Sequence, residues 1–171
     1  MSPFIPTNEG IIVAFSVFIS YSTKDLSRAR QIKRLLGGTG SKVFLAEYSL
    51  PPGSELGQAI LGAIKECDLF LLLWSSNAKS SEWVPQEVGA ARAHKRPVIP
   101  VMLHKDIELP GFLKGLKYLP LCKDSKRALV WLQRNVFQQA QKKQQRDGLV
   151  WLGVGAAVLW LLSQGLDEGD A

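Results

Sequence analysis

Cysteine and histidine are scarce in this sequence. Its two cysteines, Cys67 and Cys122, lie in apolar surroundings, and its two histidines are His94 and His104. Neither CxxC nor another metal-ligand spacing occurs, so the sequence predicts no metal site and no disulfide framework, and a reducing compartment is expected. A Ser/His/Asp triad would need one of the two histidines, and no residue pattern beside either supports one.

Three signatures of other protein classes are also missing. No GxGxxG follows the first apolar run and no GxxxxGK[ST] occurs, which argues against a Rossmann cofactor site and a P-loop. The glycines within residues 37–40 end a helical pattern, so they predict a C-cap and a turn. No basic residue precedes Lys24, so the apolar residues 11–15 are not expected to form a secretory signal.

Charge is distributed unevenly along the chain. The formal net charge is +6, and the only charged residues after Asp147 are the acidic Asp167, Glu168 and Asp170. Residues 1–148 are therefore more basic than the full chain. Lysine and arginine are scattered along the helix candidates and form no block of five or six. We therefore expect no nucleic-acid partner.

Apolar runs alternate with amphipathic segments through most of the chain. Strands are predicted over residues 11–20, 42–46, 68–74, 98–103 and 117–121, and helices over residues 26–36, 55–67, 82–94 and 125–146. The strand candidates are nearly free of polar residues, as in a sheet that is covered on both faces. This alternation predicts an α/β fold with a flavodoxin-like, doubly wound parallel sheet of five strands.

The last part of the chain is hydrophobic. Residues 149–162 carry no polar side chain, and the uncharged stretch covers residues 148–166. A helix of that length spans roughly 28 Å, enough to cross a bilayer core. Trp151 and Trp160 lie near its two ends, and basic residues precede it, as is typical of membrane anchors.

These patterns divide the chain into four parts. We expect a folded domain over residues 11–137, a basic helical linker over 138–147, a transmembrane helix over 148–166 and an acidic tail over 167–171. The charge bias would keep the domain on the cytoplasmic side of the membrane. The alternative is a terminal helix that docks on the domain or pairs with another copy in water.

Doubly wound sheets bind ligands at the carboxyl ends of their strands. Three loops of this chain converge there. They follow Ser20 and Tyr21, surround Pro52 and Gly53, and follow Trp74.

The residues of these loops resemble the conserved boxes of the Toll/interleukin receptor (TIR) domain family. The similar segments are residues 17–22 (VFISYS) with Lys24 and Asp25, the loop Leu50-Pro-Pro-Gly53, and residues 80–88 (SSEWVPQEV). They resemble, in that order, the first box, the BB loop and the WxxxE segment of the family, and the resemblance covers about residues 13–137. In the loop, Tyr48 departs from the family pattern, which often has an acidic residue there.

The resemblance implies cleavage of the bond between nicotinamide and ribose in NAD, with Glu87 as the catalytic carboxylate and no cofactor. A carboxylate near the ribose stabilises the oxocarbenium-like transition state of such a reaction. Pro85 is tolerated only in the first turn of a helix, so the helix begins near residues 81–83 and its dipole favours an ionised Glu87. The alternative is a solvated carboxylate paired with Arg92 or Lys95.

The resemblance also implies roles for neighbouring residues. Trp83, four residues before Glu87, is expected on the same helical face, where it packs against a flat ring. Ser20 and Tyr21 are expected to line the nicotinamide side, and Lys24 and Arg28 to meet the diphosphate. The alternatives are a strand end for the first pair and a solvated helix face for the second. Trp74 is expected in the core, and Asp25 at a helix start.

Two functions follow from the resemblance. The first is a membrane-tethered NAD glycohydrolase or ADP-ribosyl cyclase of immune or cell-death type signalling, activated when copies self-associate. In the family, the BB loop of one copy, here Leu50, Pro52 and Gly53, completes the pocket of the next. The second function is an adaptor that binds other TIR domains through this loop without chemistry. Glu87 favours the enzyme, because adaptors commonly lack an acidic residue there.

Overall fold

The computed structural model describes the backbone of residues 14–46 and 56–164 and the side chains of residues 14–46 and 57–148. Within these residues one parallel sheet has the strand order β2-β1-β3-β4. Its strands are β1 (Ser16–Ser20), β2 (Lys42–Leu45), β3 (Leu69–Trp74) and β4 (Val98–Met102). The helices are α1 (Leu26–Gly37), α2 (Leu56–Glu66), α3 (Ser76–Lys79), α4 (Trp83–Ala93) and α5 (Ser125–Gln164), with 3-10 turns η1 (Thr23–Asp25) and η2 (Gly111–Leu113).

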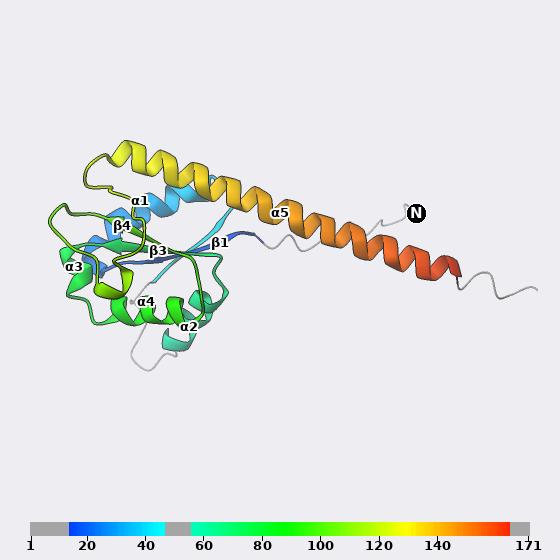
Figure 1. Ribbon diagram of the computed structural model, residues 1–171, viewed down its shortest axis with the longest axis horizontal. Coiled ribbons are helices and arrows are strands. Elements are labelled where there is room, and N and C mark those ends of the chain that lie inside the picture. Colours follow the sequence, from blue (N-terminus) through cyan, green and yellow to red (C-terminus); the bar gives the residue numbers. More distant parts are fainter. Residues whose placement is uncertain (1–13, 47–55, 165–171) are drawn as a thin grey trace, which may run out of the picture.

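The sheet lies between two layers of helices (Figure 1). Helices α1 and α5 cover one face, and α2 and α4 cover the other. Every residue of the central strand β3 is buried, as its unbroken apolar sequence predicts. The predicted doubly wound α/β architecture is therefore confirmed for the part of the chain that the structure describes.

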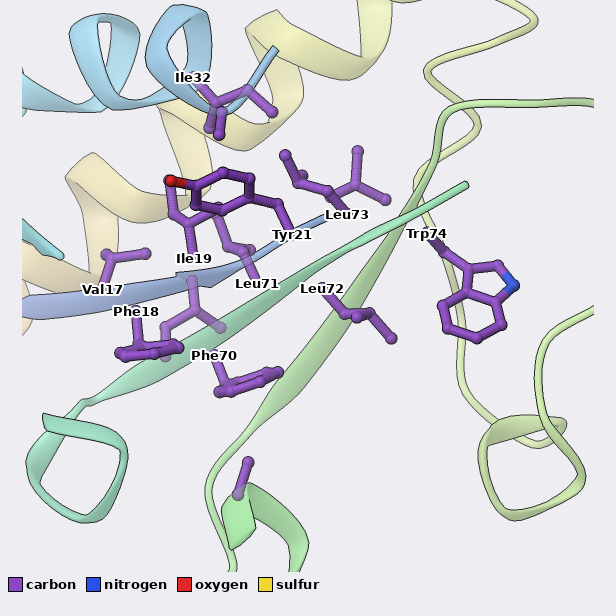
Figure 2. Close-up of a cluster of buried hydrophobic side chains, with 14 of the residues drawn as sticks. Val17, Phe18, Ile19, Tyr21, Ile32, Phe70, Leu71, Leu72, Leu73 and Trp74 are labelled. Atoms are coloured by element: carbon purple, nitrogen blue, oxygen red, sulfur yellow. The ribbon is translucent and has the colours of Figure 1, made fainter. Parts of the chain in front are cut away.

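Side chains alternate between the two faces of the sheet (Figure 2). Tyr21 lies on the side of Ile32 and α1, whereas Phe18 and Phe70 lie on the opposite side. The rings of Phe18 and Phe70 stack with their centroids 5.4 Å apart. Each strand thus contributes to two apolar layers, and this fixes the pairing register, because a slip of one residue would exchange the layers.

The predicted fifth strand over residues 117–121 is reduced to one bridge between Leu119 and Val101. The amide of Leu119 donates to the Pro100 carbonyl, and the Leu119 carbonyl accepts from the amide of Met102, both at 2.8 Å. The amide of Leu121 then turns back to the Leu119 carbonyl at 3.0 Å. The prediction was wrong here because the turn that begins at Pro120 shifts the next backbone bond by one residue. The amide of Cys122, and not that of Leu121, donates to the Met102 carbonyl at 3.0 Å, so no regular strand continues.

Other element boundaries also differ from the prediction. The strand expected over residues 11–20 is paired from Ser16, and residues 11–13 lie outside the described residues. The loop expected over residues 75–81 contains the short helix α3, whose first amides are capped by Ser75. Its hydroxyl accepts from the amide of Ala78 at 2.9 Å, the bond of an N-cap.

Helix α5 continues past residue 146 to Gln164 and extends beyond the sheet (Figure 1). No helix among the described residues is long and apolar enough to cross a membrane, so the predicted span over residues 148–166 is not supported. The strictly apolar run of residues 149–162 is short, because about 1.5 Å per residue gives roughly 21 Å against a bilayer core of roughly 30 Å. Residues 165–171, which include the predicted acidic tail, lie outside the described residues.

Candidate functional site

Glu87 is a buried carboxylate at the carboxyl edge of the sheet. Its residue is 4% exposed, and Ser20 Oγ donates a hydrogen bond to Glu87 Oε2 at 2.5 Å. A solvated carboxylate, the alternative drawn from the sequence, is therefore wrong. A carboxylate withdrawn from bulk water acts more strongly on a nearby charge than a solvated one does, because the surroundings screen it less.

Local sequence explains how the two residues meet. Helix α4 begins at Trp83 and has Pro85 in its first turn, as predicted, so Glu87 follows in the second turn. Val84 and Val88 are buried on the same helix and fix the face that α4 turns to the sheet. Ser20 is the last residue of β1, and the alternation along that strand directs it to the face that α4 covers.

A hollow of about 460 Å³ is lined by residues that lie close to this pair along the chain, Ser22 after Ser20 and Trp83 before Glu87. It is formed by the segment after β1, by α3 and its following loop, and by the first residue of α4. Its lining residues are Ser22, Thr23, Lys24, Ser76, Asn77, Ser80, Ser81 and Trp83. Trp83 is 53% exposed, and the other lining groups are hydroxyls, one amide and one ammonium group. The hollow can therefore present an aromatic surface and several hydrogen-bonding groups to a polar ligand that contains a ring.

The structure brings Ser20, Lys24, Trp83 and Glu87 to one edge of the sheet. Lys24 and Trp83 line the hollow, Glu87 lies one helical turn beyond Trp83, and Ser20 lies two residues before a lining serine. Leu50, Pro52 and Gly53, predicted as the assembly loop, lie outside the described residues.

Tyr21 and Arg28 are placed elsewhere. Tyr21 is 2% exposed, and its ring lies on the α1 side of the sheet, away from the face that holds Ser20 and Glu87 (Figure 2). Arg28 is exposed, donates to Gln31 at 3.1 Å and lines a different hollow, of about 630 Å³, beside His104. The structure therefore does not bring Arg28 into the hollow that Lys24 lines.

Sequence reasoning missed a second polar cluster at this edge. Asp25, expected only as a helix-start residue, makes no side-chain cap bond to α1. Its carboxylate instead accepts from Ser75 Oγ at 2.5 Å and from Asn77 Nδ2 at 2.9 Å. The only sequence signal for this cluster was that polar residues follow both β1 and β3, whose carboxyl ends are neighbours in a parallel sheet.

No group of three or more histidine, cysteine or acidic side chains is placed to hold a metal ion within the described part of the chain. The chemistry available at this edge is that of a buried carboxylate, hydroxyls, an amide, an ammonium group and an indole ring. These groups can hold a sugar and an aromatic base and stabilise positive charge that develops on the sugar.

Known proteins resemble this chain in sequence. A family model described as "TIR domain" matches residues 17–144. A probable 2' cyclic ADP-D-ribose synthase, BdTIR from Brachypodium distachyon, is 29% identical over 112 residues, which cover 62% of this chain and 50% of that protein. The chain thus spans half the length of this relative.

Solved structures share the fold. The TIR domain of the Toll-related receptor TRR-2 from Hydra magnipapillata superposes with a TM-score of 0.60 and 23% identity over 73% of this chain and 97% of that one. The CMP N-glycosidase BcmB from Clostridium botulinum superposes with a TM-score of 0.51 and 20% identity over 68% of this chain and 97% of that one. The match to residues 17–144, together with this fold, shows that the chain belongs to the TIR domain family.

Proposed function

We propose that this chain cleaves the bond between nicotinamide and ribose in NAD, as an NAD glycohydrolase or ADP-ribosyl cyclase, with Glu87 as the catalytic carboxylate. The observation that carries the proposal is the buried Glu87 carboxylate, bonded to Ser20 at 2.5 Å beside a hollow that Trp83 and Lys24 line. A carboxylate beside the sugar favours glycosidic cleavage because positive charge develops on the sugar in the transition state.

The chemistry requires little else from the protein. The C1′–N bond of NAD breaks with its electron pair going to the positively charged pyridinium ring, so nicotinamide leaves as a neutral molecule and no general acid is needed. Glu87 stabilises the oxocarbenium-like ribose and accepts a hydrogen bond from a ribose hydroxyl. Water attacks C1′ and loses a proton to give linear ADP-ribose, whereas an adenosine ribose hydroxyl attacks in the same way to give a cyclic product.

The other residues at this edge have supporting roles in the proposal. Trp83 provides an exposed indole face for the flat nicotinamide ring. Lys24 carries the positive charge that lines the hollow and meets the diphosphate. Ser20 holds the Glu87 carboxylate in one orientation through its hydroxyl.

Two relatives support N-glycosidic chemistry at this site. One is named as a probable cyclic ADP-D-ribose synthase, and a second, with the same fold, as a CMP N-glycosidase. Both names describe the loss of a base from a ribosyl group or a product of that loss. We further propose that the activity requires self-association, with residues 50–53 of one copy completing the hollow of the next.

The test is nicotinamide release from NAD, followed by chromatography and mass spectrometry, with the full chain at high local concentration. Three proteins are compared: the wild type, Glu87→Gln and the control Glu82→Gln, which alters an exposed glutamate at the N-cap of the same helix. We expect wild type and control to be equally active, and Glu87→Gln to lose at least about 100-fold in rate. Equal activity of folded Glu87→Gln would contradict the role of Glu87, and the products distinguish hydrolase from cyclase.

A non-enzymatic adaptor is the second candidate, and exposed apolar side chains on α5 favour it. Val130, Trp131 and Phe137 are 58%, 47% and 44% exposed, which provides apolar area for a protein partner. If folded wild-type protein releases no nicotinamide at any concentration but binds other TIR domains, the adaptor function replaces the enzyme.

A location on the cytoplasmic side of a membrane stays a prediction from the sequence, because it rests on the uncharged stretch of residues 148–166 and its basic flank. Alkaline carbonate extraction of cells that express the full chain tests whether the chain is anchored in a membrane. An integral membrane protein stays in the pellet, whereas release into the supernatant would contradict a spanning anchor.

A further inference from the structure

Asp25 joins two of the segments that form the hollow beside Glu87. It lies in the turn after β1, is 8% exposed, and bonds through separate carboxylate oxygens to Ser75 and Asn77, which follow β3. Ser75 in turn accepts from the amide of Ala78 and caps α3. Asp25 therefore fixes both the start of α3 and the side chain of Asn77, and Asn77 lines the hollow.

The carboxylate also determines which way the Asn77 amide points. A carboxylate only accepts hydrogen bonds, so it must face the NH₂ group of Asn77, and the contact is Nδ2 to Oδ1 of Asp25 at 2.9 Å. The amide oxygen of Asn77 is thereby turned away from Asp25. Among the described residues no donor reaches this oxygen, so it is an oriented acceptor on a side chain that lines the hollow.

We propose that Asn77 determines the choice of leaving group, with its amide oxygen accepting a hydrogen bond from the carboxamide NH₂ of nicotinamide, and that Asp25 is the positioning residue for this contact. The inference rests on the proposed NAD cleavage and deepens it. Nicotinamide combines a flat ring with a donating NH₂ group, and the hollow combines the Trp83 ring with the Asn77 acceptor. The ring and the amide are thus recognised by neighbouring side chains of one cavity.

Specificity against an acid analogue follows from the same geometry. Nicotinic acid adenine dinucleotide has a carboxylate in place of the carboxamide, so it offers only acceptors to the Asn77 oxygen. A site built to receive a hydrogen bond discriminates strongly against a ligand that lacks the donor, because a polar group is left unpaired. We expect the wild-type protein to prefer NAD over the acid analogue.

The test measures kcat and KM for both dinucleotides with the full chain as wild type, Asn77→Ala and the control Gln86→Ala. The control removes an exposed amide from the neighbouring helix α4, where Gln86 donates to the carbonyl of the N-cap residue Glu82. We expect Asn77→Ala to lower kcat/KM for NAD about 10- to 100-fold, with little change for the acid analogue, so that the preference is lost.

Other outcomes overturn the inference. Unchanged kcat/KM for NAD in Asn77→Ala would exclude a contact, and equal losses for both dinucleotides would assign the contact to a ribose hydroxyl instead of the carboxamide. If wild-type protein cleaves neither dinucleotide, the proposed function fails and this inference fails with it. If wild-type protein is active but Asn77→Ala leaves the preference for NAD over the acid analogue unchanged, this inference is wrong and the proposed function stands.

The positioning role of Asp25 is tested with Asp25→Asn, alone and combined with Asn77→Ala. An amide at position 25 both donates and accepts, so it no longer holds Asn77 in one orientation. We expect Asp25→Asn to reduce the preference for NAD in the wild-type background and to leave it unchanged in the Asn77→Ala background. A purely structural role would lower the rates for both dinucleotides equally, and the preference ratio would stay constant.

Discussion

Lys143 Nζ lies 2.6 Å from Asp68 Oδ2 and ties α5 to the end of the sheet that is opposite to Glu87. Asp68 precedes β3, and its carboxylate also accepts from the Ser16 amide at 2.8 Å, just where β1 begins. Lys143 is therefore a docking point of α5, although the sequence predicted only a basic linker over residues 138–147. The side chains of Lys143 and Asp68 are 14% and 25% exposed, so this ion pair is shielded from water more than the other pairs of the described residues.

Replacing this lysine should destabilise the domain. We expect Lys143→Met to lower the free energy of unfolding by about 1–3 kcal/mol, because a partly buried carboxylate loses a charged donor. The control is Lys142→Met, which removes an adjacent exposed lysine and should change stability by less than about 0.5 kcal/mol. Urea titration followed by circular dichroism measures both, and equal effects would show that the contact contributes nothing specific.

The same pair predicts a pH dependence. Burial pushes the pKa of Asp68 up, but hydrogen bonds from Lys143 and Ser16 outweigh it and hold this pKa below its ordinary value. A carboxylate whose pKa is depressed on folding stabilises the native state above the ordinary pKa, about 4, and this contribution is lost as the pH falls through the folded-state pKa. The difference in unfolding free energy between wild type and Asp68→Asn should therefore be constant from pH 7 to about pH 5 and shrink below pH 4.

The exposed Asp106→Asn is the matched control for this pH series. Its difference from wild type should stay near zero at every pH. A wild-type advantage over Asp68→Asn that persists undiminished at the lowest pH would contradict the ion pair as its source.

Sequence patterns predicted the elements whose signal is local. The run of residues 68–74 is apolar and bounded by polar residues, and β3 occupies nearly all of it. Gly37 and Gly38, which have low helix propensity, stand at the end of α1, and Pro85, which has no N–H to donate, places the start of α4. Glu87 was predicted as the catalytic carboxylate because residues 80–88 resemble the WxxxE segment of the family. The structure adds that its side chain is buried and bonded to Ser20.

Contacts between distant parts of the chain were not predictable in this way. Asp25 fits a helix cap when only its neighbours are considered, but its partners follow β3, about 50 residues later. Tyr21 is a different case. Side chains alternate between the faces of a strand, so the placement of Tyr21 opposite to Ser20 follows from the sequence once β1 is assigned. The prediction that both residues line the nicotinamide side neglected this alternation.

Cys67 should resist alkylation in the folded protein. Burial raises the pKa of its thiol to about 11, and its residue is 1% exposed, so at pH 8 only about one molecule in a thousand carries the reactive thiolate. Native protein treated with iodoacetamide should be labelled at the half-buried Cys122 and not at Cys67, and protein in urea at both. Mass spectrometry of tryptic peptides locates the label, and rapid labelling of Cys67 in native protein would contradict its burial.

Trp83 should affect substrate binding more than stability. Its side chain is about half exposed at the first position of α4, so Trp83→Ala removes little buried area and should change the free energy of unfolding by less than about 1 kcal/mol. If the indole packs against nicotinamide, its loss should raise KM for NAD about 10-fold, and Trp83→Phe should restore part of the affinity because it retains an aromatic face.

The comparison for Trp83 is Trp131→Ala, which removes a similarly exposed tryptophan on α5 that does not line the hollow of Lys24 and Trp83. All variants are assayed at the same high local protein concentration, because the proposed activity requires self-association. Added NAD should quench the fluorescence of Trp131→Ala but not that of Trp83→Ala. A KM that rises as much in Trp131→Ala as in Trp83→Ala would assign the effect to assembly through α5. A change confined to Trp83→Ala, with partial recovery in Trp83→Phe, places the ring of the substrate in the hollow beside Glu87.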